Sequence, residues 1–171
     1  MVRRQSHTLK IPGSIPGGPT SVWKLWNMLK VKEENDALCS KGERHLKEGR
    51  YKDAVRGFKM AISNDKNFAR AELGLAEINL KRLEHTISSL RSVENVEKKN
   101  PLIVKLVERD KEFFYEKGSR ESDEAIEHFQ AVVELVKKKK DTSELIKIRP
   151  NVLKECSKGI DRVEQINNWF L

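Results

Sequence analysis

The sequence predicts an all-α protein: a short α-solenoid of about three stacked helical hairpins, with an extended basic tail before them and a capping helix after them. Two observations predict this fold. Residues 38–62 place small and aromatic residues at the spacing of two packed helices, with Gly49 at the turn and Tyr51 and Phe58 between the helices. Charged residues make up 35% of the chain and hydrophobic residues 37%, a balance that suits a thin, well-solvated helical stack.

Residues 1–19 are expected to form an extended basic tail. Their segment KIPGSIPGGP consists of turn and breaker residues, and a residue that precedes proline is disfavoured in a helix. Arg3, Arg4 and Lys10 lie in this tail, and residues 1–32 contain no acidic residue. Since the net charge of the chain is +8, an anionic partner is indicated, such as RNA, an acidic protein surface or a membrane face. We interpret the tail as a docking strap.

Residues 20–34 are predicted to form a basic amphipathic helix with an N-cap at Thr20 or Ser21. Its apolar stripe consists of Val22, Leu25, Trp26 and Leu29, with Trp23 beside it. Trp23 and Trp26 are candidate anchors for a partner, because tryptophan is enriched among the residues that dominate binding energy. The alternative is that both tryptophans pack onto the neighbouring repeat as a cap.

Residues 35–140 are predicted to form a repeat domain, phased in units of about 34 residues. The first unit, 35–68, has helices on either side of a turn at 48–50, and its segment KGERHLKEGRYKDAVRGFKMAI resembles the tetratricopeptide repeat family in its small, Tyr, Ala, Phe and Ala positions. The resemblance extends over residues 35–137. It implies a non-catalytic superhelix whose concave groove binds a protein segment.

The next two units follow the family pattern less closely. The second, 69–101, is predicted to turn at Leu83, which stands in place of the turn glycine, and to end at Pro101. The third begins near 102 and is predicted to turn at Gly118 before the segment DEAIEHFQAVV. Residues 141–171 are predicted to close the stack: a short helix through Ile146 and Ile148, a break at Pro150, and a final helix. The terminal Trp169 and Phe170 either fold onto the last repeat or anchor another subunit.

The resemblance places groove residues on the first helix of each unit. They are Glu43, Lys47, Arg70, Leu73, Glu77, Lys81, Lys105, Arg109, Glu112 and Tyr115. Some family members clamp the acidic C-terminal peptide of heat-shock chaperones with lysine, asparagine and arginine residues. Lys105 and Arg109 match that clamp, but Cys39, Glu43 and Gly74 replace its other residues, which argues against chaperone docking.

Catalytic chemistry is not indicated by the sequence. No glycine-rich phosphate loop is present, and the four histidines belong to different predicted units. Cys39 and Cys156 form no metal-ligand pair with each other or with a histidine at suitable spacing. We therefore expect no enzyme activity, no metal and no cofactor. No run approaches the roughly 18 apolar residues of a membrane-spanning helix.

The predicted function is that of a scaffold or adaptor subunit of a larger protein assembly, which binds a protein segment in its groove and is anchored by its tail. Small basic helical subunits of this kind occur in axonemal microtubule complexes, and the acidic surface of tubulin would suit the strap. The expected location is therefore the cytoplasm or the cytoskeleton of a cilium. The alternative is a nucleic-acid-associated subunit, for example of a mitochondrial ribosome, in which the tail and the run of lysines at 137–140 contact phosphates.

Overall fold

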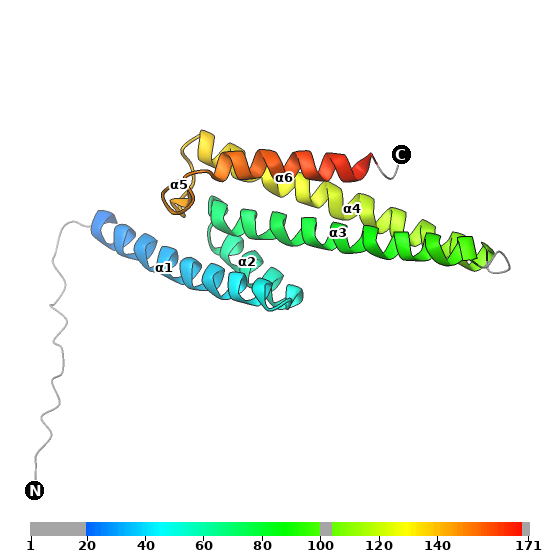
Figure 1. The fold of residues 1–171 in the computed structure, drawn as a ribbon. Helices are drawn as coiled ribbons and strands as arrows, with labels where there is room; N and C mark the ends of the chain where they lie inside the picture. The colour runs from blue at the N-terminus through cyan, green and yellow to red at the C-terminus, as the bar shows by residue number, and fades with distance from the viewer. Residues whose placement is uncertain (1–19, 100–103, 169–171) are drawn as a thin grey trace, which may run out of the picture.

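The computed structural model describes residues 20–99 and 104–168. Within these ranges every regular element is a helix, and no strand is present. The predicted all-α class is therefore confirmed. The helices are α1 (Thr20–Lys47), α2 (Tyr51–Asn64), α3 (Ala69–Lys99), α4 (Val104–Lys137), α5 (Leu145–Ile148) and α6 (Val152–Asn167) (Figure 1).

Helices α1 and α2 form the first hairpin, with their turn at the predicted place. Gly49 adopts a φ of 74°, in the left-handed region that favours glycine. The Gly49 amide donates to the Leu46 carbonyl at 3.1 Å, and the Arg50 amide donates to the His45 carbonyl at 2.9 Å. These two bonds satisfy carbonyls at the end of α1 that the helix itself cannot pair. The hairpin is thus closed by a glycine turn.

Phe58 joins this hairpin to the next helix. Its ring is fully buried and lies between Gly42 of α1 and Gly74 of α3. A β-carbon added at Gly42 would come within 2.9 Å of the ring, and one added at Gly74 within 2.4 Å. The two glycines are needed because any larger residue would occupy the volume of the ring. The core around Phe58 joins α1, α2 and the beginning of α3.

Helix α3 differs from the prediction because it is a single helix of 31 residues. The predicted turn at Leu83 is absent, and Leu83 is fully buried against Ala125 of α4 and Val163 of α6. No glycine or proline interrupts residues 75–99, and leucine has a high helix propensity. The second predicted hairpin, 69–101, is therefore wrong: its described residues continue as one helix to Lys99.

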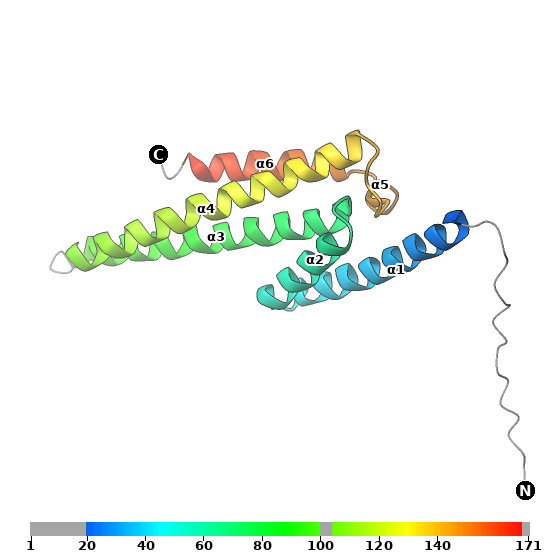
Figure 2. The ribbon, with the colours of Figure 1, turned by 180° about the vertical axis from the view of Figure 1, so that it is seen from behind.

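Helix α4 is also continuous, over 34 residues, so the predicted turn at Gly118 is absent as well. Gly118 is buried within the helix. Helices α3 and α4 pack together along their lengths (Figures 1 and 2). Phe129 and Val132 of α4 pack with residues near the beginning of α3, including Leu73. The described residues thus contain two helical hairpins, α1–α2 and the long α3–α4, in place of three short ones.

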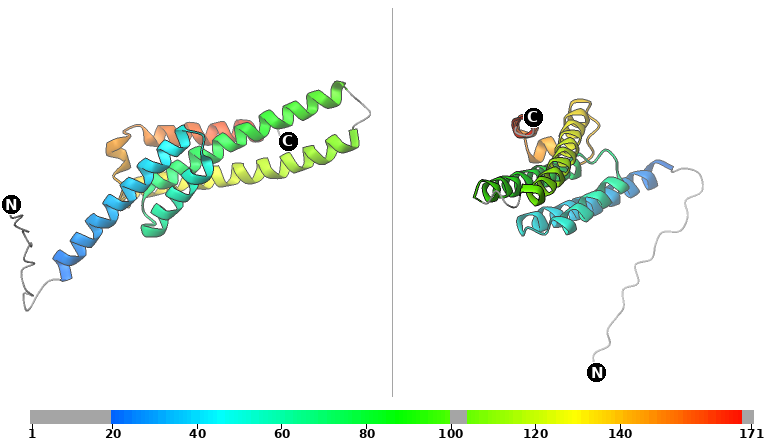
Figure 3. Two further views of the ribbon diagram at one scale, coloured as in Figure 1. Left: turned by 90° about the horizontal axis from the view of Figure 1, so that it is seen from below. Right: turned by 90° about the vertical axis from the view of Figure 1, so that its right-hand side faces the viewer.

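The C-terminal segment packs on the side of the long α3–α4 hairpin opposite to α1 and α2. Helices α5 and α6 lie where the sequence predicts a short helix, a break at Pro150 and a final helix. Helix α6 contacts α4 and α3, while α1 and α2 contact α3 from the opposite side (Figure 3). A β-carbon at Gly159 of α6 would come within 2.4 Å of the Phe129 ring, so this contact is as close as that between Gly74 and Phe58.

The first half of α1 projects beyond the rest of the molecule (Figures 1 and 2). The helix predicted at 20–34 is not a separate element, because α1 runs unbroken from Thr20 to Lys47. The tail residues Arg3, Arg4 and Lys10, and the terminal Trp169 and Phe170, lie outside the described residues. In the described parts of the chain no helix combines the length and the apolar character needed to cross a bilayer.

Candidate protein-binding surfaces

A groove lies between α1 and α3, where four of the predicted groove residues meet. Glu43 and Lys47 come from α1, and Glu77 and Lys81 come from α3. Leu46 and Leu80 add apolar surface, and the cavity has a volume of about 390 Å³. The two helices contribute alternating carboxylates and ammonium groups on either side of this apolar surface. Such a groove suits a peptide or a helix that carries charges of both signs.

Arg70 lies at one end of this groove and is held by α1. Its guanidinium donates to both carboxylate oxygens of Glu43, at 2.8 and 3.0 Å, to Asp36 at 3.2 Å and to the Ser40 hydroxyl at 3.1 Å. The hydrogen bond to Glu43 raises the pKa of Arg70 above its ordinary value. Because only 14% of the side chain is exposed, Arg70 stabilises the α1–α3 contact and is not free to bind a ligand.

The chain itself fills the groove next to Arg70. Leu145, Ile148 and Arg149 line a narrow space together with Leu73 and Glu77. Leu145 is buried, and the Arg149 guanidinium donates to Glu77 at 2.7 Å. Leu73, predicted to line the groove, is also buried beneath this segment. The concave surface is therefore shorter than predicted.

A hydrogen-bonded loop holds this segment against the beginning of α3. One Asp141 oxygen accepts from the amides of Ala69 at 3.2 Å and Ser143 at 2.8 Å, and the other accepts from the Leu145 amide at 2.7 Å. The Ser143 hydroxyl accepts from the Arg70 amide at 3.1 Å. Amides at the beginning of a helix have no partner within it, so Asp141 and Ser143 act as its caps from a distant part of the chain.

The predicted groove residues of the third unit lie elsewhere. Since α3 and α4 do not turn at Leu83 and Gly118, residues 105–115 are carried toward the far end of the long hairpin (Figure 1). Arg109, Glu112 and Tyr115 are exposed there. The side chain of Lys105 lies outside the described residues. The groove therefore contains residues from α1 and α3 together with Arg149 after α5, and the continuous three-unit groove is not formed.

The candidate anchors Trp23 and Trp26 are 68% and 61% exposed. They do not pack as a cap on the neighbouring helices. Lys30 lies over the Trp26 ring at 5.9 Å from its centroid, a cation–π arrangement. A second groove, of about 550 Å³, lies between this part of α1 and the loops at the end of α2 and before α5. Exposure of both tryptophans favours the interpretation that α1 is an interface.

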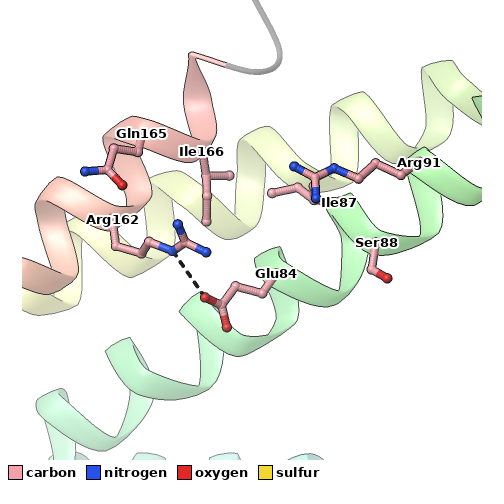
Figure 4. Close-up of a pocket in the computed structure, with 7 residues that line it drawn as sticks. All are labelled: Glu84, Ile87, Ser88, Arg91, Arg162, Gln165 and Ile166. Atoms are coloured by element: carbon pink, nitrogen blue, oxygen red, sulfur yellow. Dashed lines mark hydrogen bonds and ion pairs between the residues drawn. The ribbon is translucent and has the colours of Figure 1, made fainter.

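A third cleft, between α3 and α6, has a volume of about 270 Å³ and was not predicted from the sequence. Ile87 and Ile166 form its floor, and Ser88 and Arg91 line it from the side of α3 (Figure 4). Arg162 of α6 pairs with Glu84 of α3 at 3.4 Å across the cleft. The cleft joins helices that are about 80 residues apart, so no local pattern could have indicated it.

Both cysteines and two of the histidines lie at buried or partly buried positions. Burial raises the pKa of the Cys39 thiol to about 12 and that of Cys156 to about 11, so both are protonated at neutral pH. His128 Nδ1 pairs with Glu72 at 2.7 Å, and His45 is buried. Among the described residues no group of His, Cys, Asp and Glu side chains has the arrangement of a metal site.

No protein-family model matches the chain, and neither the curated proteins nor the solved structures contain a match to it. Its interpretation therefore depends on its own residues and contacts.

Proposed function

We propose that this chain is a non-catalytic adaptor subunit of a larger protein assembly, and that it belongs to the structural class of tetratricopeptide-like repeats. The groove between α1 and α3 would bind a protein segment, and the tail with α1 would contact a neighbouring subunit. The observation that carries the proposal is the groove of mixed charge formed by Glu43, Lys47, Glu77 and Lys81, four residues expected to face a bound segment. Glu43 and Glu77 also pair with Arg70 and Arg149, so the test is made on the two lysines.

The packing of two aromatic rings supports the repeat interpretation in a revised form. Phe58 of α2 lies against Gly42 and Gly74, and Phe129 of α4 lies against Gly159 of α6. The end of α4 thus packs against α6, the helix that follows the second hairpin, as α2 packs against α3, the helix that follows the first. On this view the chain has two repeat units, α1–α2 and α3–α4. The helices of the second unit are longer, because they include the turn predicted at Leu83 and the first part of the predicted third unit.

The proposed assembly is one with acidic surfaces, such as a microtubule complex, because the tail carries Arg3, Arg4 and Lys10 without an acid. A nucleic-acid-associated role is the second candidate, and one observation favours it: the side chains of residues 137–140, all lysines, are exposed at the end of α4. Several phosphate contacts would make that binding fall steeply as the salt concentration rises.

Affinity purification of the tagged full-length chain, with and without nuclease, tests the proposal. The decisive variant is the double charge reversal K47E/K81E, which changes only the groove. Its matched control is K52E/K158E, which reverses two exposed lysines on α2 and α6 that do not line it. We expect a defined set of proteins that survives nuclease and is retained by the control, but is lost with the groove variant. Loss of the whole set on nuclease treatment would support the nucleic-acid alternative.

A further inference from the structure

The first half of α1 bears a concentration of exposed apolar side chains. Six large hydrophobic residues between 22 and 29 are 53–69% exposed: Val22, Trp23, Leu25, Trp26, Met28 and Leu29. Isolated exposed hydrophobic residues are ordinary, but a continuous patch of several hundred Å² marks an interaction site. Two tryptophans and four aliphatic residues at these exposures present apolar area on the order of 500 Å².

The groove beside this patch has two walls of different chemistry. Leu25, Met28 and Leu29 of α1 form an apolar wall. The opposite wall is formed by the end of α2 and the loop before α5, and it carries the carboxylates of Asp65, Asp141 and Glu144. Lys32, the one lysine that lines the groove, pairs with Glu144 at 3.0 Å, and Lys147 pairs with the same carboxylate at 2.9 Å. Asp65 and Asp141 accept hydrogen bonds from neutral donors, including backbone amides and the Thr142 hydroxyl. An occupant that fits both walls is a helix with an apolar face and several basic residues.

The described part of the chain contains such a helix, and it is α1 itself. Residues 20–32 combine the apolar stripe with Lys24, Lys30 and Lys32 and contain no acidic residue. We propose that the first half of α1 from a second copy of this chain occupies the groove, and that each copy does the same for the other. The result is a two-fold symmetric dimer, in which one surface patch pairs with itself.

Charge and area both favour this occupant. Two α1 helices placed alone against each other would repel, but in the groove each meets the acidic wall of the other copy. The apolar area of about 500 Å² per copy, with the polar rim added, approaches the roughly 800 Å² per partner of a standard stable interface. The proposal depends on the proposed function only in that both treat α1 as a contact surface. A dimer would present two α1–α3 grooves to one assembly.

Sedimentation velocity of the full-length chain over a concentration series tests the proposal. We expect a reversible monomer–dimer equilibrium, with a blue shift of tryptophan fluorescence as the dimer forms, because Trp23 and Trp26 become buried. The substitution L25E should weaken dimerisation at least about tenfold, since it buries an unpaired charge. The matched control is M60E, which alters an exposed hydrophobic residue of α2 outside the patch, at 48% exposure; it should leave the equilibrium unchanged.

A second variant separates loss of the interface from loss of the fold. Lys24 is exposed within α1, so K24E should fold as the wild type does, as circular dichroism can check. The substitution should still weaken the dimer, because it places a carboxylate against the acidic wall of the other copy. A chain that stays monomeric at every concentration, or a dimer that tolerates both L25E and K24E, overturns the proposal. Either result leaves the capture of proteins by the groove, tested with K47E/K81E, unaffected.

Discussion

Replacing Gly74 by alanine should destabilise the protein, although alanine is the better helix former. In an open helix the change would stabilise by about 1 kcal/mol. Here the new β-carbon would lie 2.4 Å from Cζ of Phe58 and 2.6 Å from both Cε atoms, whereas carbon atoms in contact are separated by about 3.5–4 Å. The ring has little room to move, because α1 also lies against it: a β-carbon placed at Gly42 would be 2.9 Å from the ring. Overpacking costs about 1–3 kcal/mol, and so close a contact places this change at the upper end of that range. After the gain of about 1 kcal/mol in helix propensity, we expect a net loss of about 2 kcal/mol.

Urea denaturation followed by circular dichroism measures this loss as a lower midpoint at an unchanged slope. The control is S88A at an exposed position of the same helix, which should stabilise slightly by helix propensity alone. In a double-mutant cycle, F58L should cost less in the G74A protein than in the wild type, because the smaller residue removes the clash. If G74A is as stable as the wild type, the ring does not lie between the two hairpins and the groove beside it is not formed as described.

The remaining predictions concern other contacts. G159A should lower the free energy of unfolding by a similar amount, about 2 kcal/mol, because its β-carbon would meet the Phe129 ring at 2.4 Å. The same urea titration measures this loss, and its absence would contradict the packing of α6 on α4. R70K should cost about 1 kcal/mol, since lysine cannot reproduce the two-oxygen pairing with the Glu43 carboxylate, and R70K as stable as the wild type would refute that role. Cys39 should resist a thiol reagent at pH 8 until the protein is denatured. Burial raises the pKa of the Cys39 thiol from 9.0 to about 12, so above pH 9 the unfolded state loses a proton that the folded state keeps. The free energy of unfolding should therefore fall as the pH rises above 9. Prompt labelling of Cys39 in the native protein would refute its burial.

The first hairpin could be predicted in detail because its signals are local. Gly49 follows an amphipathic segment and precedes Tyr51 at the spacing of a tight helical turn, and the structure has that turn. The same reasoning failed at Gly118, where glycine lies inside a helix. The two glycines differ in the sequence pattern around them. Gly49 lies at a turn, where the apolar stripe of the helix is interrupted, whereas Gly118 is packed inside a helix whose apolar stripe continues.

That pattern also shows how Leu83 could have been assigned correctly. Leu73, Ala76, Leu80, Leu83, Ile87 and Leu90 follow one another at intervals of three and four residues, without the break that a turn would impose. A fixed repeat length predicts a turn at Leu83, whereas the unbroken apolar stripe predicts the continuous helix that α3 forms.

The groove between α1 and α3 was predicted in part. The predicted phasing makes α1 and α3 the first helices of neighbouring units, so the meeting of Glu43, Lys47, Glu77 and Lys81 could be inferred. The filling of the groove by Leu145 and its neighbours depends on contacts between segments more than 70 residues apart, such as the bond between Asp141 and the Ala69 amide. Side-chain spacing within one helix contains no information about such contacts.

The two ends of the stack differ in a way that bears on assembly. A stack of packed helices leaves an apolar face open at each end unless something covers it. At the C-terminal end α6 provides the cover, with Val152, Cys156 and Val163 buried against the long hairpin. At the other end no described helix covers the first half of α1, and its apolar residues are exposed. Since the groups exposed there match the groove beside them in both polarity and charge, a second copy of the chain can supply at this end what α6 supplies at the other.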